Sequence, residues 1–176
     1  MAYFTALSIP PEITALLKTI RPALTDATWM HPDDYHLTLA YLGEPSSDIC
    51  NLFWQNISKR IHPSQTIQLK QLHVFRNVTG CVLVLLADVM VELEALHVDH
   101  VQTARLAGID VHTFPAFMPH VTLASFPVQV LNMEDLALQS LPAWTAGEVT
   151  LYKSNKPHGT GVGRYEALES YLLKTT

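Results

Sequence analysis

The sequence predicts an α+β fold made of two similar halves around a cleft. A short run of the form H-[LV]-T-L-A occurs at residues 36–40 and again at residues 120–124. Helical and strand periodicities alternate through both halves, and 48% of residues are hydrophobic against 15% charged, which is ample for a buried core. We therefore expect one domain, residues 1–176, with two lobes related by a pseudo-two-fold axis and one repeat in each. In this arrangement two antiparallel sheets face a central cleft and the helices lie outside.

In the first half, strands are expected at residues 3–7, 27–30, 35–42, 66–75 and 81–87. A helix is expected over residues 10–24, because prolines stand at its start and apolar residues recur at helical spacing. These apolar residues are Ile13, Leu16, Leu17, Ile20 and Leu24. A second, amphipathic helix is expected over residues 45–61. Its apolar stripe is Ile49, Leu52, Phe53, Ile57 and Ile61.

The second half repeats this order. A helix is expected over residues 88–108, ending at Gly108. The residues expected on its buried face are Met90, Leu93, His97, Val101 and Ala104. A strand follows at residues 119–126, and Asn132 is a good N-cap for a short helix over residues 132–141. Residues 144–154 and 164–173 form a closing pair of strands.

Composition excludes several classes of protein. No apolar run approaches 18 residues and residues 1–12 lack a basic leader, so neither a membrane span nor a secretory signal is expected. Cys50 and Cys81 are far apart, which argues against a disulfide scaffold or a zinc site and fits a reducing, cytoplasmic setting. The net charge of −5 disfavours binding to duplex DNA. We expect a monomer that binds a small anionic ligand through a local basic patch.

The repeated motif places polar side chains on one face of each strand. Because successive strand residues point to opposite faces, His36 and Thr38 share one face, as do His120 and Thr122. Such faces are costly to bury without partners, so we expect them to line the cleft. A single such histidine is most often structural. Two copies that lie 84 positions apart (120 minus 36) are poorly explained by packing alone.

Two imidazoles and two hydroxyls around one volume suit metal-free cleavage of a phosphodiester. One imidazole removes a proton while the other donates one, and threonine hydroxyls stabilise the phosphate oxygens. With unperturbed histidines, the pH profile would be a bell whose limbs lie around ~6.5.

These motifs resemble the two-histidine (2H) phosphoesterase superfamily, especially the bacterial RNA 2′,3′-cyclic phosphodiesterases, formerly called 2′-5′ RNA ligases. The resemblance also covers the segments YFTALSIPPEI, WMHPDDYHLTLAYLG, FMPHVTLASF and LYKSN…GRYEAL. It implies a bilobal fold in which each lobe supplies one motif. It further implies that His36 is the general acid for the leaving oxygen and that His120 is the base that activates water. A 2′,3′-cyclic phosphate would then open to the 2′-phosphate.

One position departs from the family pattern. Many members of the cyclic phosphodiesterase branch carry an arginine just after the second motif, where this chain has Ser125. A compensating cation is available from Lys153, Lys156 or Arg164, unless that segment is simply a solvated loop. Two further candidates lie at the end of a strand. Phe75 suits base stacking, with a core aromatic as the alternative, and Arg76 suits phosphate binding, with an exposed charge as the alternative.

The remaining histidines do not form a recognisable metal site. His97 and His100 are spaced i, i+3 with His112 further on, but no carboxylate or cysteine completes a ligand set. We expect His97 to pack in a helix interface. No phosphate-binding glycine loop or nucleophile elbow is present, so no cofactor is expected.

The leading functional hypothesis is hydrolysis of a 2′,3′-cyclic phosphate on an RNA end or a small nucleotide. Within the same class, the alternatives are 2′-5′ oligoadenylates, ADP-ribose cyclic phosphate and cyclic oligonucleotide signals. A non-catalytic nucleotide-binding module is a different class, but it would not need two proton-transfer groups. A purely structural protein would leave the two polar faces unexplained.

Overall fold

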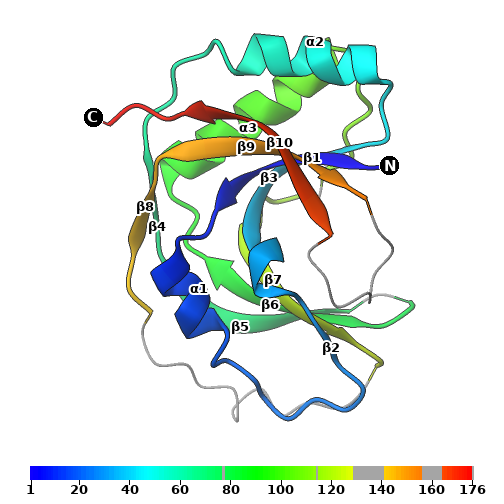
Figure 1. The fold of residues 1–176 in the computed structure, drawn as a ribbon, viewed down its shortest axis with the longest axis vertical. Helices are drawn as coiled ribbons and strands as arrows, with labels where there is room; N and C mark the ends of the chain where they lie inside the picture. The colour runs from blue at the N-terminus through cyan, green and yellow to red at the C-terminus, as the bar shows by residue number, and fades with distance from the viewer. Residues whose placement is uncertain (77, 114, 129–140, 156–163, 176) are drawn as a thin grey trace.

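The computed structural model describes residues 1–76, 78–113, 115–128, 141–155 and 164–175 (Figure 1). The elements run in the order β1 (Tyr3–Ser8), α1 (Pro11–Leu17), β2 (Thr28–Trp29), the 3-10 helix η1 (Pro32–Asp34), β3 (His36–Gly43), α2 (Ser47–Ile57), β4 (Gln65–Ile67), β5 (Leu69–Arg76), β6 (Cys81–Ala87), α3 (Val91–Leu106), β7 (His120–Phe126), β8 (Trp144–Ala146), β9 (Glu148–Ser154) and β10 (Tyr165–Leu172). The predicted α+β class is confirmed.

The strands form one main sheet with a narrow junction. Its order is β10-β9-β1-β3-β7-β6-β5, with β2 also paired to β7, and β4 and β8 make a small separate sheet. All the pairings between these strands are antiparallel. Strands β3 and β7 are joined in register at the single pair Leu37–Val121. The two antiparallel sheets expected from the sequence are therefore two halves of one sheet, joined at this pair.

The two halves of the sheet do not correspond to the two halves of the chain. Strands β5 and β6 precede α3 in the sequence, yet they lie on the β7 side of the junction. Strands β9 and β10 come last, yet they return to pair alongside β1. Each half of the sheet is thus completed by strands from distant parts of the sequence, which the simple repeat of elements did not predict.

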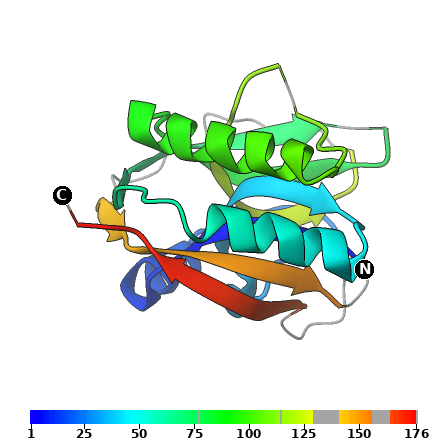
Figure 2. The same ribbon diagram turned by 90° about the horizontal axis from the view of Figure 1, so that it is seen from above.

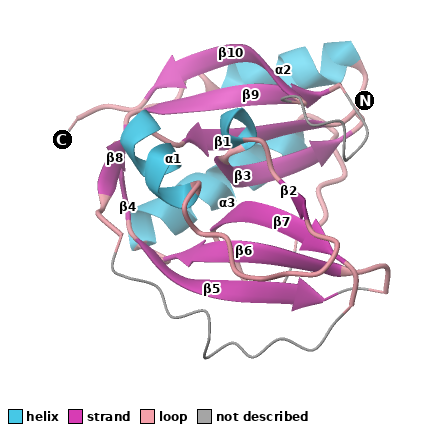
Figure 3. Cartoon of the chain, turned by 60° about the horizontal axis from the view of Figure 1, so that its bottom comes forward, coloured by secondary structure: helices cyan, strands magenta, loops and turns pink. Residues whose placement is uncertain are grey.

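Helices α2 and α3 lie side by side over one face of the sheet, as Figure 2 shows from above. Figure 3 shows α1 on the side of the β1–β3 half that is turned to the viewer. The buried residues of α2 are Cys50, Phe53, Trp54 and Ile57. In the part of the chain that is described, every helix is too short or too polar to cross a membrane.

The helices differ in detail from the predicted ones. Helix α1 stops at Leu17, because the chain turns at Lys18 and the hydroxyl of Thr19 donates to the carbonyl of Leu16. The buried stripe of α2 is rotated, so Leu52 (49% exposed) faces solvent, and Ile61 (70% exposed) lies beyond the end of the helix at Ile57. The periodicity was right, but the boundary and the packing direction depend on tertiary contacts.

Two further predictions concern the strand expected over residues 66–75 and the helix expected over residues 132–141. The strand expected over residues 66–75 is two strands, β4 and β5, because β4 leaves the main sheet to pair with β8. Gln68, at the break, donates to the carbonyls of Leu69 and Leu141. The helix expected over residues 132–141 lies almost entirely outside the described residues.

Helix α3 buries two histidines in different ways. The ring of His97 stacks on Phe117 with centroids 4.0 Å apart, and its Nδ1 donates to the carbonyl of Leu39 at 2.6 Å. His97 therefore packs against neighbouring elements, as predicted. The expected face was rotated here too, since Met90 is exposed and His100 is fully buried.

His100 belongs to a buried hydrogen-bonded chain that links α3 to three other segments. The chain consists of Thr5, His100, Tyr171, His62 and Asp99, with successive distances of 2.9, 2.8, 3.3 and 2.7 Å. A carboxylate only accepts, so the Nε2 of His62 donates to Asp99, and the Nδ1 of neutral His62 accepts from Tyr171. The Nε2 of His100 then donates to Tyr171, and its Nδ1 accepts from Thr5. We call these five residues the His100 chain.

Candidate active site

Both motif strands contain the same irregularity. In β3 the register with β1 skips Leu39, and in β7 the register with β6 skips Leu123. Such a bulge shifts the alternation of side chains by one position. The exposure pattern agrees, because Tyr41 and Ser125, five residues after each histidine, face outward rather than into the core. The bulge therefore turns Ser125 to the same face of its strand as His120.

The four motif residues surround the junction of the sheet. Leu37 and Val121 pair at its centre and are fully buried on the opposite face. Extending this antiparallel register by one residue sets His36 opposite Thr122 and Thr38 opposite His120. All four side chains are half-buried. Each histidine is therefore next to the threonine of the other motif, as a pseudo-two-fold axis requires.

The two imidazoles are held in the same way. Nδ1 of His36 lies 2.7 Å from the carbonyl oxygen of Asp34, and Nδ1 of His120 lies 2.7 Å from that of Met118. A carbonyl oxygen only accepts, so each Nδ1 carries a hydrogen and donates. In the neutral ring Nε2 is then unprotonated and can accept a proton. The backbone thus sets one tautomer for both histidines.

Aromatic side chains surround both histidines. The ring of His36 lies 4.7 Å from Phe4, 5.0 Å from Tyr165 and 6.1 Å from Tyr152, between centroids. The ring of His120 lies 5.1 Å from Phe75, edge to face. Phe75 is thus beside the site. Sequence reasoning did not single out Phe4 and Tyr152, although the alternation of β1 and β9 is the signal that could have placed them.

Both histidines are disfavoured as cations in the free protein. Burial, with smaller contributions from the charges of His120 and Arg164, lowers the pKa of His36 to about 4, against its hydrogen bond to Asp34. Burial also lowers the pKa of His120, with a contribution from His73 and against its hydrogen bond to Met118. The effect of His120 on His36 reflects their closeness. An anionic ligand between them would raise both pKa values.

Comparison with known proteins agrees with this geometry. Residues 7–82 match the family model described as LigT like Phosphoesterase. The fold is similar to that of Escherichia coli LigT in its apo form, with a TM-score of 0.74 and 22% identity over 99% of this chain and 98% of that chain. The chain therefore has the fold of these proteins, and the family match covers residues 7–82.

Two other solved structures show the same fold. A protein described as a phosphoesterase has a TM-score of 0.77 at 22% identity, covering 99% of this chain and 98% of that one. TT0787 of Thermus thermophilus has a TM-score of 0.75 at 23% identity, covering 99% of both chains. No protein of curated function matches the sequence.

The predicted basic residues lie differently with respect to the candidate site. Arg164 is near His36, and its guanidinium lies 5.0 Å from the ring centroid of Tyr165. Lys153 is turned away, because it follows Tyr152, which stacks on Phe4 beside His36, and adjacent strand residues face opposite ways. The register therefore does not favour Lys153 as a ligand, and its part in binding stays a prediction.

Two basic candidates remain predictions. Arg76 contacts the Sγ of Cys81, its partner in the β5–β6 register, and Cys81 pairs in turn with Phe126. The backbone of Arg76 therefore lies beside the end of β7 that is away from His120. Lys156 lies outside the described residues. Among the described residues, no group of three His, Cys, Asp or Glu side chains is arranged to hold a metal ion.

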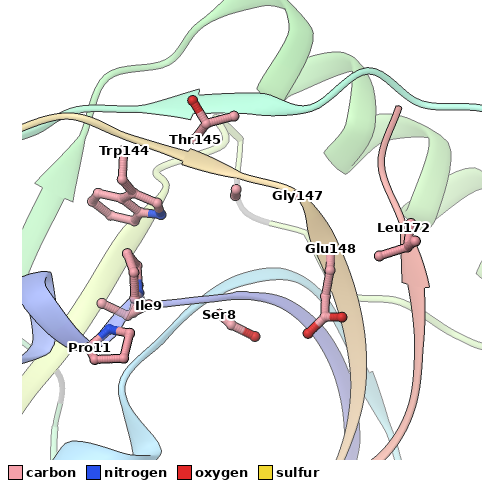
Figure 4. Close-up of a pocket in the computed structure, with 10 residues that line it drawn as sticks. Ser8, Ile9, Pro11, Trp144, Thr145, Gly147, Glu148 and Leu172 are labelled. Carbon is pink, nitrogen blue, oxygen red and sulfur yellow. The ribbon is translucent and has the colours of Figure 1, made fainter. Parts of the chain in front are cut away.

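A pocket lies at the end of β1, beside the candidate site formed by the four motif residues (Figure 4). Its wall includes Ser8, Trp144, Glu148 and Leu172, and none of the four motif residues lines it. The hydroxyl of Ser8 lies 3.4 Å from that of Tyr152, which connects the pocket to the aromatic surroundings of His36. Since Glu148 would repel a phosphate, the reacting group belongs at the motif residues and not in this pocket.

The lowered pKa values change the pH profile expected from the sequence. If one histidine acts as acid and the other as base, the kcat/KM profile is a bell set by the free protein. A group whose pKa is lowered releases its proton at lower pH, so both limbs move down from ~6.5 and the optimum lies on the acid side. Steady-state rates across the pH range with a 2′,3′-cyclic mononucleotide measure this. The kcat profile should lie at higher pH than the kcat/KM profile, because the bound anion favours the protonated imidazoles. An optimum for kcat/KM above neutrality would contradict the prediction.

Proposed function

We propose that this protein hydrolyses a phosphodiester without a metal ion, its preferred substrate being a 2′,3′-cyclic phosphate on an RNA end or a small nucleotide. The observation that carries the proposal is the symmetric pair of imidazoles. His36 and His120 lie across one pseudo-two-fold junction, each with Nδ1 bound to the backbone and with Nε2 available for proton transfer. A binding module has no need of this arrangement.

The proposed reaction uses each of the four motif residues once. Nε2 of His120 takes a proton from water as the water oxygen attacks phosphorus. The bond from phosphorus to O3′ breaks, and protonated His36 gives its proton to O3′. The hydroxyls of Thr38 and Thr122 donate hydrogen bonds to the non-bridging oxygens and stabilise the charge that gathers on them. The product is a 2′-phosphate with a free 3′-hydroxyl, and proton exchange with solvent restores both histidines.

A nucleotide substrate fits the surroundings of the two histidines. Tyr152 and Tyr165 on one side and Phe75 on the other, all half-buried, offer aromatic rings within reach of a base. Escherichia coli LigT, which shares the fold, has been crystallised with 3′-AMP, ATP, NADP+ and phosphate. These are all nucleotides or phosphates, which supports the same class of ligand here.

The expected product tests this proposal. Because acid and base are held on opposite sides of the phosphate, only one oxygen can leave, so a nucleoside 2′,3′-cyclic phosphate should give the 2′-phosphate alone. Phosphorus NMR or chromatography distinguishes this product from the 3′-phosphate. The reaction should persist with excess chelator. A mixture of 2′- and 3′-phosphates, or activity that a metal ion restores after chelation, would contradict the mechanism.

The same assay separates the alternative substrates. Parallel reactions contain 2′-5′ oligoadenylate, ADP-ribose cyclic phosphate and a cyclic dinucleotide, each at the same concentration as the cyclic mononucleotide. Faster turnover of one of these would assign the natural substrate to that group and retain the two-histidine chemistry. Binding of all of them without turnover would favour a non-catalytic module.

A further inference from the structure

Asp34 links the first motif to the start of β10. Its side chain is buried, and its carboxylate accepts hydrogen bonds from the backbone N–H of Arg164 at 2.9 and 3.1 Å and from that of Tyr165 at 3.2 Å. Its backbone carbonyl accepts from Nδ1 of His36 at 2.7 Å. One residue therefore orients the imidazole of His36 and also holds the backbone of Arg164 and Tyr165 against it.

The side chain of Arg164 extends toward the edge of the sheet where the motif strand β7 pairs with β2. Its guanidinium contacts the sulfur of Met30. Met30 lies at the end of β2, and its backbone N–H donates to the carbonyl of Leu123 at 2.8 Å. In the same pairing, Thr28 lies opposite Ser125. A cation on β10 thus reaches the strand segment that carries Ser125.

We propose that Asp34 is a positioning residue that places the guanidinium of Arg164 beside His36, where it takes over the part of the arginine that Ser125 replaces. The inference rests on the proposed function, because it assigns the cation of that same site. Ser125 lies on the same face of its strand as His120 after the bulge but carries no charge, so the second motif by itself supplies no positive group for the phosphate.

The charge of Arg164 already acts on the site in the free protein. Its guanidinium lies 5.0 Å from the ring of Tyr165, which lies 5.0 Å from the ring of His36, and its charge makes a small contribution to the lowered pKa of His36. An arginine also stacks well on an aromatic ring, and Tyr165 provides this support from the adjacent position in β10. The carboxylate of Asp34 fixes the backbone of both residues, so its loss should release the cation and the ring together.

The experiment compares Arg164→Gln, Asp34→Ala and the double variant. We expect each single variant to lower kcat/KM by roughly 10²-fold, the scale for loss of one group that stabilises transition-state charge. The double variant should be no slower than Arg164→Gln, because Asp34 acts through Arg164. Asp34→Asn keeps an acceptor oxygen and should lose less than Asp34→Ala. Adding Ser125→Arg to Arg164→Gln should recover part of the lost activity.

A second measurement does not depend on turnover. NMR titration of His36 in the absence of substrate should show a higher pKa in Arg164→Gln than in the wild type, because a nearby positive charge has been removed. The same substitution should raise the pKa of His36 less when Asp34 is already alanine, because the guanidinium has then been displaced. Asp33→Ala and Arg105→Gln are matched controls on exposed side chains outside the site, and both should titrate like the wild type.

The outcomes distinguish this inference from the proposed function. Shifted titration of His36 in a protein that turns over no phosphodiester would support the positioning by Asp34 while refuting the reaction. Normal turnover by the wild type, with an effect of Arg164→Gln on the pKa of His36 that is the same with and without Asp34, would overturn the inference and leave the reaction intact. Thermal unfolding followed by circular dichroism identifies a variant that fails to fold, and Asp34→Asn then carries the comparison.

Discussion

Replacing either motif histidine by alanine should lower kcat/KM by roughly 10²-fold or more, since each replacement removes one proton-transfer group from a metal-free reaction. His36→Ala removes the acid that protonates the leaving oxygen, and His120→Ala removes the base that activates water. The folded state should survive, because both side chains are half-buried and face the cleft. Initial rates with a cyclic mononucleotide measure the loss. His112→Ala is the matched control, since that side chain is 92% exposed and lies outside the site.

The double replacement gives a sharper test of cooperation. When two groups act in one proton relay, removal of the first leaves the second with little to do. The variant lacking both His36 and His120 should therefore be slower than the wild type by much less than the product of the two single losses. Near-normal activity in either single variant, or fully multiplicative losses, would show that the two histidines do not act as one acid–base pair.

Replacing His100 by leucine should have the largest effect on stability. The substitution leaves the hydroxyl of Thr5 buried without its partner, at about 1–3 kcal/mol for an unsatisfied group, and removes one of the two partners of the Tyr171 hydroxyl, which still donates to His62. We expect the free energy of unfolding to fall by about 2–5 kcal/mol, measured by urea denaturation. Tyr171→Phe, which removes a single hydroxyl from the His100 chain, should cost less. An unchanged unfolding midpoint in His100→Leu would mean that the hydrogen bonds of the His100 chain contribute nothing to stability.

The same histidine makes stability depend on pH. Burial, with smaller contributions from the charges of His62, His97 and Arg60, lowers the pKa of His100 to about 3. Between about pH 6.5 and 3 the unfolded state binds a proton that the folded state does not, so this contribution to stability is complete above pH 6.5 and is lost as the pH falls. For each such histidine, the free energy of unfolding falls by about 1.4 kcal/mol for each pH unit within this range. His36 contributes in the same direction down to about pH 4. In His100→Leu the free energy of unfolding should depend less steeply on pH, by the contribution of one histidine.

The sequence predicted the elements better than it predicted their pairing. Strand periodicity located the strands of the main sheet, because a two-residue alternation is a local property of the chain. It did not show that β5 and β6 complete the β7 half while β9 and β10 complete the β1 half, since strand partners are selected by contacts between distant residues. The buried faces of α2 and α3 were misplaced for the same reason. Periodicity identifies an apolar stripe, whereas the neighbouring elements decide which edge of that stripe is covered.

The residues of the candidate site were also predicted only in part. The four motif residues were identified because their chemistry is repeated in the sequence itself. Asp34 was missed because its part depends on N–H groups that are 130 and 131 residues away in the chain. Composition alone does not reveal the face of a strand on which Lys153 lies, whereas its neighbour Tyr152 stacks on Phe4. Charge in a sequence locates a candidate, but only the register shows where that charge points.

The exchange of strands between the two halves has a consequence for how the chain is made. Strand β1 leaves the ribosome well before its partner β9, which is synthesised more than a hundred residues later. Until then, one edge of β1 has no strand to pair with, and the half that holds His36 stays incomplete. Pairings between such distant segments form slowly, because long loops must close before the contacts stabilise them. We therefore expect the β5–β6–β7 half, whose strands are closer in sequence, to form during synthesis and the other half to close only after release. A nascent chain halted after residue 128 should accordingly protect β6 from hydrogen exchange and leave β1 unprotected.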